Sequence, residues 1–90
     1  MSESGKNRIT VEISNRKFTV VGEESTQHIK MVASLVDQKM EELRYAKPSL
    51  DTSQLAVLTA LNTMSDYLKL KEEYNALIQN EREKNRRKNG

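Results

Sequence analysis

The chain has 90 residues, no cysteine and a formal net charge of +2 at pH 7. The length suits one small domain with an extension, and the lack of cysteine excludes a disulfide framework and a thiolate metal site. No apolar run approaches the roughly 20 residues that span a bilayer, and the polar residues 1–8 do not resemble a signal peptide. We therefore expect a soluble, cytoplasmic protein with no membrane partner.

The N-terminal part predicts a β-hairpin that follows a disordered segment, residues 1–6. Apolar and polar residues alternate from residue 7 to 13, which is typical of a half-buried strand, and a second β-rich run spans residues 17–22. Asn15 lies between the runs and tolerates a positive φ, so a tight turn is expected there. A lone hairpin is marginal in water and must pack on a helix. Its shared apolar face would comprise Ile9, Val11, Ile13, Phe18 and Val20.

A first, amphipathic helix is expected to begin near Ser25, a suitable N-cap, and to end at Lys47, because the residue before Pro48 is pushed out of the helical region. Met31 and Leu35 lie off its apolar stripe, as isolated surface residues or as a second contact face. Because the connector after Pro48 is short, the two helices should be packed neighbours. The stripe that faces a core comprises Ile29, Val32, Ala33, Val36, Met40 and Leu43.

The second helix is expected from Asp51 to about Arg86, a stretch without proline or glycine. Asp51 and Gln54 have the spacing of a capping box. A helix of about 35 residues would be about 50 Å long, and a chain this short cannot cover such a length with its own core. The helix is therefore interpreted as an assembly device.

Two apolar seams run along this second helix. The first half is apolar on more than one side, which favours a core position, whereas the second half carries a single heptad-like stripe that favours a coiled coil. Asn62 is a polar residue inside the apolar part and is expected to be buried and hydrogen-bonded. One seam is Val57, Leu61, Met64 and Leu68, and the other is Ala60, Thr63, Tyr67, Leu70, Tyr74 and Leu77. The residues expected to mediate oligomerisation are Leu58, Leu61, Tyr67, Leu70, Tyr74, Leu77 and Ile78.

After Ile78 the sequence becomes charged, and five basic residues stand against two acids in residues 79–90. This tail is interpreted mainly as a solvated, fraying helix end, where cations suit the helix dipole. The sequence thus predicts an α+β fold in two parts. Residues 7–66 form a globular head of hairpin, first helix and half of the second, and residues 67–90 form a coiled-coil extension in a dimer or tetramer.

No catalytic or cofactor-binding pattern is present in the sequence. His28 is the one histidine and has no metal-ligand or nucleophile partner nearby, and the three glycines are too scattered to form a phosphate-binding loop. The adjacent acids at 41–42 and 72–73 diverge on their helices. We expect a protein that is not an enzyme and needs no cofactor or metal.

In this order, the elements resemble the ZapA family of bacterial cell-division proteins, which associate with the tubulin-like protein FtsZ. The resemblance covers residues 11 to about 74. It rests on three stretches: VEISNR at 11–16, MVASLVD at 31–37, and LAVLTALN at 55–62 followed by DYLKLKEEY at 66–74. The family has glycine where this chain has Asn15, and the coiled-coil tail here is short.

This resemblance implies a dimer whose long helices pair as coiled coils, with dimers joining into antiparallel tetramers. It also implies that the protein binds FtsZ, bundles its protofilaments and stabilises the division ring at mid-cell. By alignment, the candidate FtsZ-binding residues are Arg16, Lys39 and Arg44. The alternative for each is an ordinary solvated residue, paired with an acid such as Glu41 in the case of the two helix residues.

Two other functions are compatible with the pattern. One is a small basic DNA-binding dimer, since strand-then-helix chains that form β-ribbons read DNA. Against it, the outward strand positions include an acid and no arginine, so no nucleic-acid partner is expected. The other is a coiled-coil adaptor with a partner other than FtsZ. The outward strand positions considered are Thr10, Glu12, Thr19 and Val21.

Overall fold

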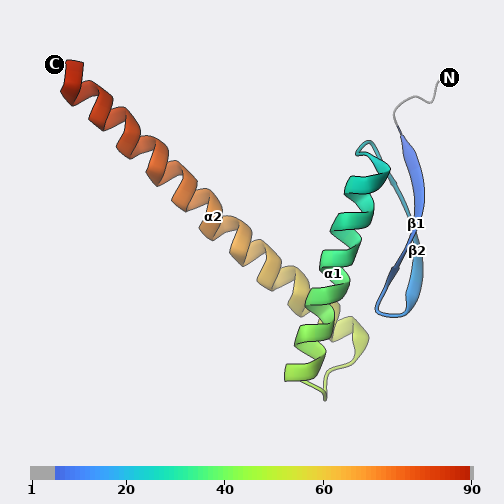
Figure 1. Cartoon of the computed structure of the whole chain (residues 1–90). Coiled ribbons are helices and arrows are strands. Elements are labelled where there is room, and N and C mark those ends of the chain that lie inside the picture. Colours follow the sequence, from blue (N-terminus) through green and yellow to red (C-terminus); the bar gives the residue numbers. More distant parts are fainter. Residues whose placement is uncertain (1–5, 90) are drawn as a thin grey trace. The chain divides into compact units, whose positions relative to one another are not determined.

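The protein consists of an antiparallel β-hairpin followed by two helices (Figure 1). In this computed structural model, residues 6–89 are described, with side chains as far as Arg86. The elements are β1 (Asn7–Ile13), β2 (Arg16–Gly22), α1 (Thr26–Ala46) and α2 (Thr52–Asn89). The predicted α+β fold is confirmed. The predicted disorder of residues 1–6 lies, except for Lys6, outside the described residues.

The chain divides into two packing units between Thr59 and Ala60, inside α2. The first unit holds the hairpin, α1 and the first turns of α2. The second unit consists of the rest of α2. At about 1.5 Å per residue, the 38 residues of α2 form a helix roughly 57 Å long.

The hairpin is closed by a two-residue turn in which both residues have a positive φ. Ser14 has φ 55° and Asn15 has φ 63°, and a two-residue loop of this kind is a type I′ turn, whose twist matches that of the flanking strands. Ile13 and Arg16 are the last paired residues before it. The predicted tight turn is confirmed, and Ser14 shares the left-handed conformation that the sequence predicted for Asn15.

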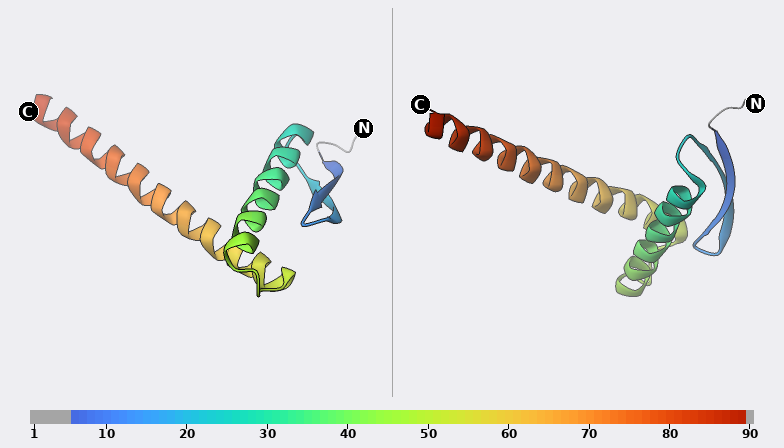
Figure 2. Two further views of the ribbon diagram at one scale, coloured as in Figure 1. Left: turned by 60° about the horizontal axis from the view of Figure 1, so that its bottom comes forward. Right: turned by 45° about the horizontal axis from the view of Figure 1, so that its top comes forward.

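The core of the first unit lies between the hairpin and α1 (Figure 2). Val11 on β1 and Ile29 and Ala33 on α1 are buried, and partly buried side chains surround them. Val11 pairs with Phe18 and Ile9 with Val20 across the hairpin, so the predicted apolar face is present. The partly buried residues are Ile9, Ile13 and Val20.

The predicted burial of Phe18 and Val32 is wrong for the single chain. Phe18 is 46% exposed and Val32 is 44% exposed. The physical reason is that α1 packs mainly against β1. Phe18 on β2 is therefore only partly covered, whereas Val20 on the same strand still packs against the core cluster. Val20 and Val32 help to line an open apolar groove of about 310 Å³ between the hairpin and α1.

Side-chain caps set the ends of the helices as the sequence predicts. The Ser25 Oγ accepts a hydrogen bond of 3.0 Å from the backbone N–H of His28 at the start of α1. α1 ends at Ala46, two residues before Pro48. Asp51 and Gln54 form the reciprocal capping box of α2, with side-chain to backbone hydrogen bonds of 2.8 and 3.0 Å.

The first turns of α2 contribute a second buried region. They lie beside the C-terminal half of α1 in Figures 1 and 2, whereas the rest of α2 belongs to the second unit. Leu55 is fully buried, and Met40 on α1 is 4% exposed. Both side chains belong to the first unit.

We predict that Leu55→Ala lowers the free energy of unfolding by about 2–5 kcal/mol, because it leaves a cavity at a fully buried site. The matched control is Tyr45→Ala, at a position 91% exposed, which should change stability by less than about 0.5 kcal/mol. Urea denaturation at one fixed protein concentration gives both values. Equal stability of the two variants would contradict the assignment of Leu55 to the core.

Candidate functional site

A single chain leaves an unusually large surface accessible to solvent. Its accessible surface is 7610 Å², whereas a folded monomer of 10.3 kDa is expected to expose about 5,400 Å². The excess of roughly 2,000 Å² is of the size that obligate dimers bury. Most of the large hydrophobic side chains that are exposed among the described residues lie on α2.

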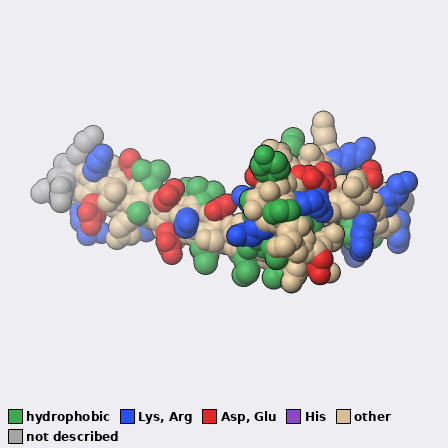
Figure 3. All heavy atoms as spheres, turned by 90° about the horizontal axis from the view of Figure 1, so that it is seen from below, with side chains coloured by type: hydrophobic (Ala, Val, Ile, Leu, Met, Phe, Trp, Pro, Cys, Tyr) green, Lys and Arg blue, Asp and Glu red, His purple; other side chains and the backbone are tan. Residues whose placement is uncertain are grey.

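The main candidate surface is the exposed apolar side of α2, which we call the assembly face. Figure 3 shows hydrophobic side chains at the surface along this helix, between acidic and basic ones. Leu58 and Ile78 are half-buried. The members of the assembly face are each between 52% and 65% exposed: Val57, Leu61, Met64, Tyr67, Leu68, Leu70, Tyr74 and Leu77.

The expectation that the first half of α2 lies in a core is only partly met within one chain. Leu55 and Thr59 are buried, because they lie four residues apart on the same side of the helix. Asn62 is half-buried. The apolar residues on the remaining sides are exposed, because the described residues 6–89 form no further element that could cover them. The uncovered residues of this seam are Val57, Leu61, Met64 and Leu68.

The distal part of the assembly face has the spacing of a coiled-coil seam. Tyr67, Leu70, Tyr74 and Leu77 follow one another at steps of three and four residues. Three of them, together with the Lys71 stem, surround a shallow hollow of about 390 Å³. A hollow between residues of this spacing is the kind of site that takes a knob from a second helix.

α1 carries a smaller exposed apolar strip. Met31 is 62% exposed and Leu35 is 56% exposed. The two are four residues apart and therefore lie side by side on the helix. Their geometry is that of a continuous strip rather than of isolated surface residues.

The three basic residues named from the sequence are not brought together into one patch. Arg16 is exposed at the start of β2, and Lys39 and Arg44 are half-buried on α1. Lys39 and Arg44 are five residues apart, which places them about 140° apart around the helix. Lys39 lies three residues after Val36 and shares its side of α1. Arg44 lies three residues after Glu41, on a different side.

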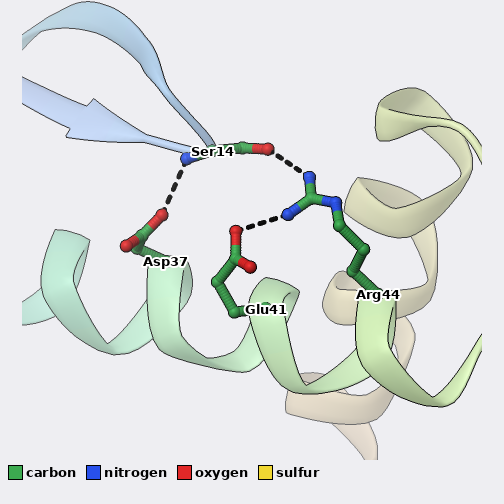
Figure 4. Close-up of polar contacts among 4 residues, drawn as sticks. All are labelled: Ser14, Asp37, Glu41 and Arg44. Carbon is green, nitrogen blue, oxygen red and sulfur yellow. Dashed lines mark hydrogen bonds and ion pairs between the residues drawn. The ribbon is translucent and has the colours of Figure 1, made fainter. Parts of the chain in front are cut away.

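Arg44 belongs to a polar cluster that ties the hairpin turn to α1, which we call the turn clamp (Figure 4). The Ser14 backbone N–H donates to Asp37 Oδ1 at 2.7 Å. Arg44 Nη2 donates to Ser14 Oγ at 2.6 Å. Arg44 Nη1 forms an ion pair with Glu41 Oε2. The clamp consists of Ser14, Asp37, Glu41 and Arg44.

Sequence reasoning named Arg44 and its pairing with Glu41, but missed the roles of Ser14 and Asp37. The available signal was the spacing of Asp37 and Arg44, seven residues apart and therefore on one side of α1. Ser14 lies at the tip of the hairpin that packs on this helix. Its backbone N–H can donate to Asp37 and its hydroxyl can accept from Arg44.

Within residues 6–89, no three histidine or acidic side chains are placed to hold a metal ion. Neither helix of this region carries an apolar run sufficient for a transmembrane span. The exposed surfaces of the described residues include the assembly face, the α1 strip and the basic Arg16 of the head.

These features define a small α+β protein with a hairpin head and a long helix whose apolar face is exposed in the single chain. A family model described as "Cell division protein ZapA" matches residues 9–89. The chain belongs to the ZapA family of cell-division proteins.

Similar proteins support this assignment along most of the chain. A cell division protein ZapA from Oceanobacillus iheyensis is 63% identical over 78 residues, which cover 87% of this chain and 91% of that protein. One from a Geobacillus species is 54% identical over 79 residues, covering 88% and 91%. A solved structure described as a ZapA mutant dimer from Geobacillus stearothermophilus is 49% identical, with a TM-score of 0.70 and coverage of 88% and 92%.

Proposed function

We propose that this chain is a non-enzymatic cell-division protein that self-assembles through α2 and binds FtsZ. By this proposal it crosslinks and bundles FtsZ protofilaments and stabilises the division ring at mid-cell in the cytoplasm. The observation that carries the proposal is the assembly face, a set of large apolar side chains more than half exposed in one chain. Exposed apolar surface on this scale marks a site of protein association.

The first step is a homodimer. The uncovered apolar surfaces of the head are the early part of the assembly face and the strip of Met31 and Leu35 on α1. A second copy of the chain offers surfaces of the same kind, and the similar protein from Geobacillus stearothermophilus is described as a dimer. We place the head at residues 7–66 and the extension at residues 67–90.

The second step joins dimers through the distal seam into an antiparallel tetramer. The seam runs from Tyr67 to Leu77, and its next heptad positions are Glu81 and Lys84, which are poor core residues. The coiled coil therefore weakens toward the tail, which favours reversible association.

FtsZ binding is assigned to basic residues of the head, namely Arg16, Lys39 and Arg44. FtsZ is named as the partner because the sequence resembles a family whose members associate with FtsZ. A tetramer carries four copies of each contact, so weak single contacts become effective when several engage one bundle of filaments. This multivalency accounts for crosslinking without any catalytic step.

We predict that the protein sediments with polymerised FtsZ and increases the pelleted fraction, because a multivalent particle links filaments into bundles. The measurement is low-speed sedimentation of FtsZ polymers with and without the protein, and unpolymerised FtsZ is the control. Absence from the pellet together with unchanged bundling would leave the FtsZ proposal without support. Salt-dependent retention of duplex DNA would instead favour a DNA-binding dimer. If the protein bound neither FtsZ nor DNA, an adaptor with another partner would be favoured.

We also predict that Leu77→Glu and Ile78→Glu each convert tetramers into folded dimers, because a charge placed in the distal seam, at Leu77, or directly beside it, at Ile78, must be desolvated on pairing. Gln79→Glu is the matched control, since it adds the same charge on the other side of the helix. Analytical ultracentrifugation gives the masses, and circular dichroism reports the helix content. Monomers, or no change of mass at all, would contradict the division of α2 into a head segment and a tetramer segment.

A further inference from the structure

The hairpin turn holds a residue in a conformation that it does not favour by itself. Ser14 has φ 55°, a left-handed conformation that is unfavourable for an L-residue with a Cβ. Such a conformation persists where the surroundings determine it. Asn15, the other residue of the turn, tolerates a positive φ more readily.

The turn clamp supplies the surroundings that determine this conformation. Ser14 is only 9% exposed, and α1 satisfies both its backbone N–H, through Asp37, and its hydroxyl, through Arg44. Both hydrogen bonds involve an ionised side chain, and such bonds are stronger than neutral ones. The tip of the hairpin is thus held to α1 by two contacts on a single residue.

The position of Arg16 depends on this turn. Arg16 is the first residue of β2, two positions after Ser14, and pairs with Ile13 across the hairpin. Because successive side chains of a strand point to opposite faces, a change of turn conformation that shifts the register by one residue moves Arg16 to the other face. The exposed guanidinium of Arg16 is therefore aimed by the geometry of residues 14 and 15.

Arg44 itself is poorly suited to a direct contact. Its side chain is 34% exposed, one terminal nitrogen donates to Ser14, and the other pairs with Glu41. An acidic partner would have to compete with both interactions and with the Glu41 charge. Arg16 is exposed at the tip and is the better placed of the two for such a partner.

We propose that Arg44 is a positioning residue, which acts with Asp37 to hold the Ser14–Asn15 turn so that Arg16 contacts an acidic surface of FtsZ. This inference rests on the proposed function and changes the role of one of its three candidate residues. Arg44 supports FtsZ binding through the hairpin and makes no contact with FtsZ.

The test compares Ser14→Ala, Arg44→Ala and Arg16→Ala in the full-length protein. Ser14→Ala removes the hydroxyl that Arg44 holds but changes no charge. We expect it to weaken FtsZ binding about as much as Arg44→Ala does, roughly tenfold, and the double variant to be no weaker than either single variant, because the two residues act as one unit. Binding is measured by titration of immobilised FtsZ, and hydrogen exchange reports the backbone amides of residues 13–17.

A rescue variant separates positioning from contact. Glycine adopts a positive φ without cost, so adding Asn15→Gly to Arg44→Ala should stabilise the turn and restore most of the FtsZ binding while the Arg44 charge stays absent. Amide exchange at the turn should be faster in Ser14→Ala and Arg44→Ala, slower again in the rescued variant, and unchanged in Arg16→Ala. Arg16→Ala should lose binding with the turn intact.

Two results would overturn the positioning role: normal FtsZ binding by Ser14→Ala beside weak binding by Arg44→Ala, or no rescue by Asn15→Gly although turn exchange is restored. Each would make Arg44 a direct contact. Failure of the wild-type protein to bind FtsZ would instead refute the proposed function. Thermal unfolding of each variant shows whether a substitution has destabilised the whole fold. If one single variant is unfolded, FtsZ binding by the Arg44→Ala, Asn15→Gly double variant decides between positioning and direct contact.

Discussion

The length of α2 is the constraint on which the rest of the structure depends. An uninterrupted helix of 38 residues presents apolar side chains on more surface than the hairpin and α1 can cover. Between Thr52 and Arg86 of α2, the buried residues are Leu55 and Thr59, both in its first turns. Because apolar surface of this size is costly to leave in water, the helix directs the protein toward association with other copies of itself.

In the head, the main structural requirement is that the two-stranded hairpin be stabilised by packing, because such a hairpin is marginal by itself. α1 supplies an apolar surface for β1 and a polar clamp for the turn. The apolar contacts fix which face of the hairpin is inward, and the clamp fixes the tip through Ser14. Under the proposed function, this arrangement gives each copy a rigid basic tip, and α2 determines how many tips one particle carries.

The sequence was sufficient to predict the elements, their order and their caps, because these depend on local features such as the Ser25 cap, the Asp51–Gln54 box and Pro48. It was not sufficient to predict which apolar residues a single chain buries. Val32 and Phe18 fit the apolar pattern but are exposed, since α1 lies against β1 and not beneath the whole hairpin. The spacing of apolar residues shows which side of a helix or strand is apolar, but not which other element packs against that side. The clamp was missed because it joins residues 23 and 30 positions apart, and the basic candidates rested on family resemblance alone.

The most direct test of this account is the mass of the wild-type protein as a function of its concentration, measured by sedimentation equilibrium. The account predicts at least twice the chain mass of 10.3 kDa at low micromolar concentration and a rise toward four times that mass as the concentration increases. A folded protein of 10.3 kDa at every concentration would contradict the central claim.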